Sequence, residues 1–248
     1  MQSHIICHQA DGVLEIQLNR PDKKNALTNQ MYADIQTAMQ HALTDDRVKV
    51  ILFTALGDFF TAGNDVADFL AISESPTAEF NALKFIKLLG DYPKPIIAAV
   101  TGSGVGIGMT ILLHCDLIYI LAQAKLYAPF VNLAVVPEAA SSLLLTQRIG
   151  YTRAFNMFVM GEPLGGSEAV ALGIANQAFA TPEEVLTVAR QKAGILAKKP
   201  YQAVLQTKHL MRDSVKILDT IHQENQCFTE RVKSEEAQQI FQAFLAKK

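Results

Sequence analysis

The sequence predicts an α/β fold whose core repeats one structural unit and is followed by a helical region. The repeated unit is a buried apolar strand, a loop of small residues and a helix, and three copies follow one another from residue 48 onward. One unit cannot bury its apolar face alone, so neighbouring copies are expected to stack. After the third copy the pattern becomes helical, with a clear break at Pro200. We therefore expect a core over residues 1–195 and a helical lobe over residues 196–248 that is not an independent domain.

The N-terminal segment predicts a hairpin and then a first helix. Strand-favouring residues lie on both sides of Asp11 and Gly12, a pair that is common in hairpin turns. A loop follows, and Thr28 or Asn29 can cap the amphipathic helix expected over residues 30–46.

The three repeated units differ in their loops but share the buried strand. Each strand is a short run of almost only apolar residues, which is typical of strands covered on both faces. Polar and glycine-containing stretches separate the runs. Strands are expected at 48–55, 96–101 and 116–123, and loops at 56–65 and 102–108. A helix is expected at 65–72; after a polar break at 73–77, a second helix runs to about Leu89. Further helices are expected at 107–115 and around Glu138, followed by later helices, of which the first is capped by Ser167 and ended by Gly173.

Composition favours a cytoplasmic globular protein. Half of the 248 residues are hydrophobic, 19% are charged and the net charge is −2, which gives no sign of a nucleic-acid surface. The three cysteines, Cys7, Cys115 and Cys227, lie far apart and form no CxxC pair, which favours a reducing compartment. No signal peptide is visible, and glycines interrupt the longest apolar stretch, so we expect no membrane association.

Two loops of small residues are candidates for binding a negatively charged oxygen. The segments TAGND (61–65) and GSGVGIG (102–108) each follow a buried strand and open a helix. A helix start presents unpaired N–H groups, so two such loops that converge form an oxyanion hole. The alternative is that the glycines only allow close packing of strand and helix.

Other known motifs do not fit these segments. The glycines of GSGVGIG alternate and never give the GxGxxG dinucleotide fingerprint, and the chain has no GxxxxGK[ST] phosphate loop. Ser103 is not in a GxSxG frame, which argues against a hydrolase nucleophile. His4 and His8 share a strand face about 13 Å apart, too far to bind one metal ion. His114 and Cys115 end an apolar helix and are expected in the core. No metal site is predicted.

Glu138 is an isolated carboxylate in an otherwise apolar segment. No other charge occurs between Lys125 and Arg148. One explanation is a helix start, since Glu after Pro is stabilised at the positive end of a helix dipole. The other is a catalytic base in a dry pocket, where burial strengthens its hold on a proton.

Four motifs in order give the chain a resemblance to a known family. They are LNRPDKKNALT, DFFTAGNDVADF, KPIIAAVTGSGVGIGMTILLHCDLIYI and VVPEAASSLLLTQRIG. With them the sequence resembles the crotonase superfamily of enoyl-CoA hydratases and isomerases over nearly its whole length. The resemblance implies a spiral of ββα units, a C-terminal region that helps to form a homotrimer or a hexamer, and acyl-CoA substrates. No separate cofactor is expected, because coenzyme A is part of the substrate.

The resemblance also implies site residues. The backbone N–H groups of the family's oxyanion hole correspond here to Asn64 and Ile107. From the residues alone, Lys24 fits a solvated loop lysine equally well, and Asp65 fits a helix cap better than a ligand contact. The implied substrate-binding residues are Lys24, Ala26, Ala62, Gly63, Asn64, Asp65, Val66, Gly106 and Phe130.

Four C-terminal residues lie where family members complete the coenzyme A site. They are Lys208, Phe241, Phe244 and Lys247. Their spacing also suits plain helix packing, which we favour.

Departures from the hydratase pattern point to one branch of the family. The two glutamates with which hydratases activate water are replaced by Thr110 and Phe130, whereas Glu138 stands where the Δ3,Δ2-enoyl-CoA isomerase branch has its single base. We therefore expect an isomerase that moves a 3-enoyl-CoA double bond to 2-trans-enoyl-CoA. The alternatives are another crotonase reaction (isomerisation of an aromatic-derived ring thioester, or weak hydration), a non-catalytic acyl-CoA binder, and a structural protein.

Overall fold

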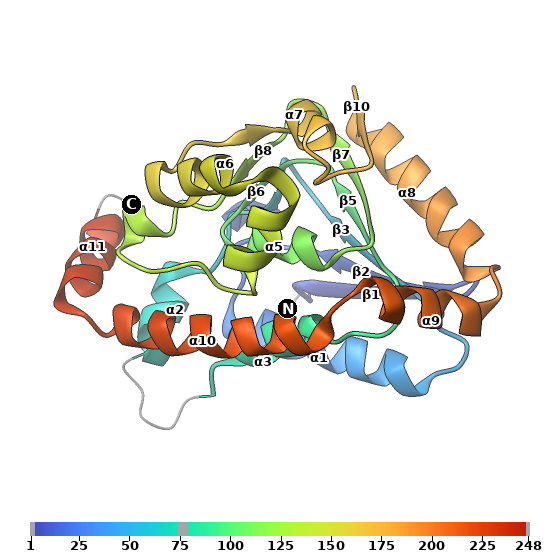
Figure 1. Cartoon of the computed structure of the whole chain (residues 1–248), viewed down its shortest axis with the longest axis horizontal. Coiled ribbons are helices and arrows are strands. Elements are labelled where there is room, and N and C mark those ends of the chain that lie inside the picture. Colours follow the sequence, from blue (N-terminus) through green and yellow to red (C-terminus); the bar gives the residue numbers. More distant parts are fainter. Residues whose placement is uncertain (1–2, 74–78, 247–248) are drawn as a thin grey trace.

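The core of the protein contains two β-sheets with helices around them (Figure 1). The computed structural model describes residues 3–73 and 79–246. The larger sheet has the strand order β1-β2-β3-β5-β7-β10 and the smaller one β4-β6-β8-β9. The strands are β1 Ile5–Ala10, β2 Val13–Leu18, β3 Val50–Ala55, β4 Phe59–Thr61, β5 Ile96–Val100, β6 Ser103–Val105, β7 Leu117–Leu121, β8 Lys125–Tyr127, β9 Leu164–Gly165 and β10 Gln177–Phe179.

The repeated unit predicted from the sequence is present and contains a second strand. The parallel strands β3, β5 and β7 lie side by side in the larger sheet, and β4, β6 and β8 follow them into the smaller sheet. Each unit is therefore strand, strand and helix. The sequence pattern places 59–61 and 103–105 in loops, because strands of three residues are too short to show an alternation.

The helices around the sheets follow most of the predicted boundaries. The turn at Asp11 and Gly12 joins the antiparallel β1 and β2, as expected. Thr28 caps the first helix, since its Oγ1 accepts a hydrogen bond from the Met31 N–H. The predicted break at residues 73–77 falls almost entirely outside the described residues. The α-helices are α1 Asn29–Thr44, α2 Val66–Ser73, α3 Asn81–Gly90, α4 Ile107–Thr110, α5 Ser141–Ile149, α6 Tyr151–Phe155, α7 Gly166–Ala171, α8 Pro182–Ala197, α9 Tyr201–Met211, α10 Ser214–Val232 and α11 Glu235–Ala246.

The central strands of the larger sheet, β3, β5 and β7, are buried on both faces, which explains their apolar sequences. Alternate residues of β3 point to opposite faces, so Ile51 joins the main core whereas Leu52 joins a second cluster under α8. Helix α8 lies along that second face and presents Val185, Ala189 and Ala193, spaced by four residues, to the strands. The sheet therefore holds a rigid set of strand ends, from which the loops of the smaller sheet project.

Four further local predictions are wrong. Glu138 is not in a helix, because α5 begins three residues later at Ser141. Ser167 lies inside α7 and does not cap it. The helix expected over 107–115 is a short α-helix followed by a 3₁₀ turn, Ile111–His114. The region after the third unit is not wholly helical, since β10 pairs in parallel with β7.

The C-terminal helices pack against the core. After a break before Pro200, α9, α10 and α11 run along one side of the molecule, with α10 beside α3 (Figure 1). Ile217, Ile221 and Phe228 of α10 are buried in the same core as the strands. Within residues 3–73 and 79–246, no helix has the length and apolar character needed to cross a membrane.

Candidate active site

The two small-residue loops leave the ends of neighbouring strands. Strands β4 and β6 are parallel, with Thr61 opposite Gly104, so the loops that follow emerge at the same edge of the smaller sheet. A Cβ on Gly63 would lie 2.9 Å from the Val105 carbonyl oxygen, and one on Gly108 would lie 2.8 Å from the Thr61 carbonyl oxygen. Only glycine allows so close an approach. These glycines therefore have a packing role, and the close packing brings the two loops together.

The backbone amides predicted for the oxyanion hole are free to bind an oxygen. Within the described part of the chain, neither the Asn64 nor the Ile107 N–H donates a hydrogen bond, whereas the neighbouring N–H groups of Asp65 and Gly106 do. The Gly106 N–H is bound to the Tyr127 carbonyl, and a Cβ on Gly106 would meet no atom within 4 Å. Open space therefore lies beside Gly106, next to the free amide of Ile107.

The predicted substrate-binding residues of the N-terminal loop are joined to the first of these loops. The Ala62 N–H donates to the Lys24 carbonyl (2.9 Å), and the Leu27 N–H donates to the Gly63 carbonyl (2.8 Å). The Lys24 ammonium lies 5.0 Å from the centre of the Phe59 ring. The structure thus brings Lys24, Ala26 and residues 62–66 into one continuous surface.

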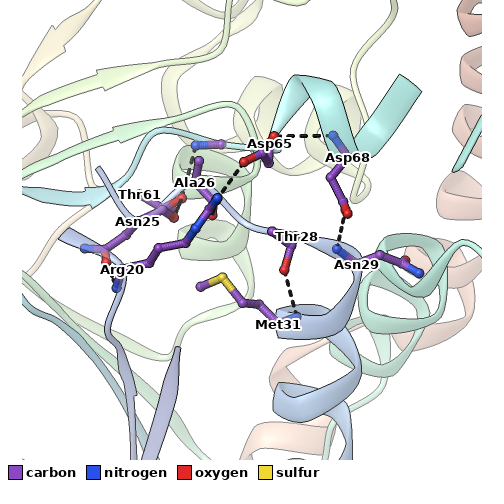
Figure 2. A network of polar contacts seen from close by, with 10 residues as sticks. Arg20, Asn25, Ala26, Thr28, Asn29, Met31, Thr61, Asp65 and Asp68 are labelled. Carbon is purple, nitrogen blue, oxygen red and sulfur yellow. Dashed lines mark hydrogen bonds and ion pairs between the residues drawn. The ribbon is translucent and has the colours of Figure 1, made fainter. Parts of the chain in front are cut away.

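Figure 2 shows the polar network that fixes this surface. The Arg20 guanidinium donates to the Ala26 carbonyl (2.9 Å) and to the Asp65 carboxylate (2.7 Å). The other oxygen of Asp65 accepts from the Asp68 N–H at the start of α2. Asp65 is therefore a helix cap and an ion-pair partner, as the sequence favoured, and its backbone N–H donates to the Leu27 carbonyl (2.9 Å).

Glu138 is a buried carboxylate with one oxygen available. Its side chain is 5% exposed, and Oε1 accepts a hydrogen bond from the Thr110 hydroxyl (2.5 Å). Oε2 is buried without a partner among the described residues. Burial raises the pKa of Glu138 to about 8, opposed by the Thr110 hydrogen bond and assisted by the charge of Glu224. A carboxylate of this kind can take and return a proton near neutral pH.

Glu138 is hydrogen-bonded to the helix that the second loop opens, and its charge acts on Tyr32, which is bonded to the first loop. Thr110 belongs to α4, the same short helix that begins with Ile107. On the other side, the Tyr32 hydroxyl donates to the Asn64 side-chain oxygen (2.5 Å). The pKa of Tyr32 is raised well above its usual value by burial and then by the charge of Glu138. Tyr32 was not predicted as a site residue, since its place in the buried stripe of α1 looks like ordinary packing.

Comparisons with known proteins agree with this geometry. A family model described as enoyl-CoA hydratase/isomerase matches residues 8–248. This chain belongs to that family. The enoyl-CoA hydratase/isomerase of Pseudoalteromonas atlantica T6c has a solved structure that is 32% identical, with a TM-score of 0.92 over 99% of this chain and 98% of that one. The crotonase fold expected from the sequence is thereby confirmed.

Relatives of known name include isomerases and hydratases. The enoyl-CoA delta isomerase 2 of Rattus norvegicus is 34% identical over 254 residues, covering 98% of this chain and 64% of the relative. The 2,3-dehydroadipyl-CoA hydratase of Escherichia coli is 28% identical over 248 residues, covering 99% and 97%. This chain spans 54% to 64% of the length of the enoyl-CoA delta isomerases that it matches. Membership of the family therefore leaves the reaction open.

Thr110 and Phe130, which the resemblance sets at the positions of the hydratase glutamates, are both in the core. The Thr110 hydroxyl donates its hydrogen bond to Glu138. Phe130 is 6% exposed, and its ring lies 5.9 Å from that of Phe158. Neither residue can deprotonate water. Glu138 is thus the only carboxylate among these three positions.

The remaining candidates have structural roles. Lys208 forms an ion pair with Asp116 (2.8 Å), and the Phe241 ring is buried 5.8 Å from that of Phe69. These contacts fit the helix-packing interpretation, whereas Lys247 and the Phe244 side chain lie outside the described residues. His114 and Cys115 are in the core as predicted. Among the residues that the structure describes, no group of three His, Cys, Asp or Glu is arranged to hold a metal ion.

Proposed function

We propose that this protein is an isomerase that converts 3-enoyl-CoA thioesters to 2-trans-enoyl-CoA, with Glu138 as the single base. The observation that carries the proposal is the unpartnered Oε2 of a buried carboxylate whose pKa is raised to about 8. The free amides of Asn64 and Ile107 lie on loops that contact each other, and Glu138 is hydrogen-bonded to Thr110 in the short helix that begins at Ile107. A base and an oxyanion hole are the two components that removal of a proton next to a thioester requires.

The reaction follows from these groups without added water. Oε2 of Glu138 takes a proton from C2 of the substrate, and the negative charge moves to the thioester oxygen as a dienolate forms. The amides of Asn64 and Ile107 hold that oxygen, each contributing on the order of 3 kcal/mol in the transition state. Glu138 then returns the proton to C4, which restores its charge and leaves the double bond between C2 and C3.

The rest of the site binds the thioester and keeps water away. We assign the coenzyme A part to the surface of Lys24, Ala26 and residues 62–66, together with Gly106. Phe130, buried at a position where hydratases handle water, helps to keep the intermediate away from solvent protons.

We also propose that the C-terminal lobe forms a homotrimer or a hexamer. A groove of about 670 Å³ lies between α5, α9 and α10. Met211, which lines the groove, and its neighbour Leu210 in α9 are 83% and 84% exposed, and Val215 of α10 is 73% exposed. Clustered apolar side chains of this kind are typical of surfaces that another chain covers.

Turnover of 3-enoyl-CoA esters by Glu138→Gln tests the proposed reaction. We expect the variant to lose turnover by several orders of magnitude yet to bind acyl-CoA, because only the base is removed. Glu230→Gln is the matched control, since Glu230 is an exposed carboxylate on α10. Near-normal turnover by Glu138→Gln would remove Glu138 as the base. Assays with 2-enoyl-CoA and ring thioesters in parallel separate the other reactions of the family, and binding without hydrogen exchange at C2 identifies a non-catalytic binder.

A further inference from the structure

The turn that carries Glu138 has an unfavourable backbone conformation. Ala139 and Ala140 both have left-handed φ angles, +59° and +53°, although neither is glycine. Each costs about 1 kcal/mol or more relative to an ordinary conformation. Both residues are fully buried, so solvent cannot stabilise the turn. Contacts from elsewhere in the protein must therefore hold it.

One of these contacts comes from α10 in the C-terminal lobe. The Glu224 carboxylate accepts hydrogen bonds from the Ala140 N–H (2.6 Å), the Ser142 N–H (2.9 Å) and the Ser142 hydroxyl (2.5 Å). Glu224 is 7% exposed and lies 84 residues from Ala140 in the chain. It therefore binds the last residue of the turn and the first turn of α5 together, as a capping carboxylate does.

The second contact holds the other side of the turn. His114 bonds through Nε2 to the Ala139 carbonyl (2.7 Å), and its Nδ1 lies 2.6 Å from the Arg212 guanidinium. Arginine can only donate, so Nδ1 accepts and Nε2 carries the hydrogen that Ala139 receives. Arg212 also belongs to the C-terminal lobe, between α9 and α10.

From these contacts we propose that Glu224 is a positioning residue for the reaction: it holds the strained turn of Glu138 from α10 and places a second carboxylate charge behind the base. This inference rests on the proposed role of Glu138 as the base. It gives the C-terminal lobe a part in catalysis that is separate from any assembly of subunits.

The charges around the base agree with this role. The groups that act on Glu138 are Thr110 from α4 and Glu224 from α10, and the charge of Glu138 in turn raises the pKa of Tyr32 from α1. His114 is neutral, because burial and then the charge of Arg212 lower its pKa to about 3.

Burial raises the pKa of Glu224 itself, and its hydrogen bonds oppose that rise. All three of its hydrogen bonds are donated to it, so they favour its ionised form. The charge of Glu224 then raises the pKa of Glu138.

Three variants separate holding the turn from placing the charge. Glu224→Gln removes the negative charge of the carboxylate. The NH₂ group of the glutamine then faces an N–H donor, so one hydrogen bond is lost. We expect kcat to fall by about tenfold or more while KM stays unchanged. We also expect the ascending limb of the pH–rate profile to move to lower pH. Glu224→Asp keeps the charge but is too short for both amides, so kcat falls while the limb stays. Glu230→Gln, the exposed control on α10, behaves like the parent.

The proposal is overturned if Glu224→Gln has the kcat of the parent and if the ascending limb of its pH–rate profile also stays where it is in the parent. Should that variant fail to fold, Ser142→Ala replaces it, because it removes one of the three donors and adds nothing to the core. Ser142→Ala must then lower kcat at unchanged KM, and a parent-like kcat is the contradicting result.

A stability cycle tests the same coupling without any turnover. We expect Glu138→Gln to raise the melting temperature at about pH 9 more in the parent than in Glu224→Gln, because only the parent has two facing charges. At about pH 5, where Glu138 is protonated, Glu138→Gln should change the melting temperature equally in the parent and in Glu224→Gln. Equal increments at both pH values contradict the inference. A parent without isomerase activity would end the proposed function and leave this cycle to decide on Glu224.

Discussion

Replacing Glu138 with glutamine is expected to stabilise the protein while it abolishes turnover. Burial raises the pKa of Glu138 from its ordinary value of 4.5 to about 8. The folded state therefore holds this proton more tightly than the unfolded chain, and the stability that it provides is complete below about pH 4.5 and is lost as the pH rises through 8. The shift corresponds to up to about 5 kcal/mol. Glutamine cannot ionise, so Glu138→Gln keeps its stability through this range.

Thermal unfolding at fixed protein concentration measures the difference. At about pH 9 the variant should melt about 10 °C or more above the parent, since 1 kcal/mol shifts the melting temperature of a chain of this size by about 2–4 °C. At about pH 4.5 the two should melt together. Fixed concentration matters, because oligomerisation itself changes the melting temperature. A difference in melting temperature between variant and parent that does not change with pH would refute a strongly raised pKa for Glu138. It would also refute a catalytic base kept in a dry pocket.

Three further results are expected. The kcat/KM for 3-enoyl-CoA should rise with pH through about 8, because Glu138 must be ionised to accept a proton, and a flat profile there contradicts this. Thr110→Val removes the hydrogen bond that lowers the pKa of Glu138, so the ascending limb of the pH–rate profile should move to higher pH. Thr110→Ser should keep the limb where it is in the parent. An ascending limb that stays in place in both variants rules out the contact. Gly108→Ala places a methyl group 2.8 Å from the Thr61 carbonyl oxygen and should reduce kcat by parting the oxyanion loops, whereas Gly194→Ala, with no atom within 4 Å, should leave kcat unchanged. Equal kcat values in both alanine variants would show that the loop contact does not matter.

The sequence predicted those parts of the fold whose pattern has one physical meaning. The apolar runs of β3, β5 and β7 are short and lie between turn-forming segments, which favours buried strands, and the structure covers them on both sides. The Thr28 cap and the capping role of Asp65 follow from local chemistry, so the sequence indicated both. Strands of two or three residues, such as β4 and β10, leave no periodicity to detect.

The turn of Glu138 could not be predicted, because distant residues determine it. Alanine favours helix, and the sequence around Ala139 and Ala140 reads as a helix start. The structure instead holds both residues in left-handed conformations through His114 and Glu224. Glu224 gave no signal, since one carboxylate on an amphipathic helix is ordinary surface composition.

The fate of the hydrogen at C2 tests the single base most directly. A 3-enoyl-CoA ester with deuterium at C2 is converted in ordinary water, and the 2-enoyl product is analysed for deuterium at C4. One buried carboxylate that carries the proton between the two carbons predicts label at C4. A product in which all new hydrogen at C4 comes from the solvent would contradict it.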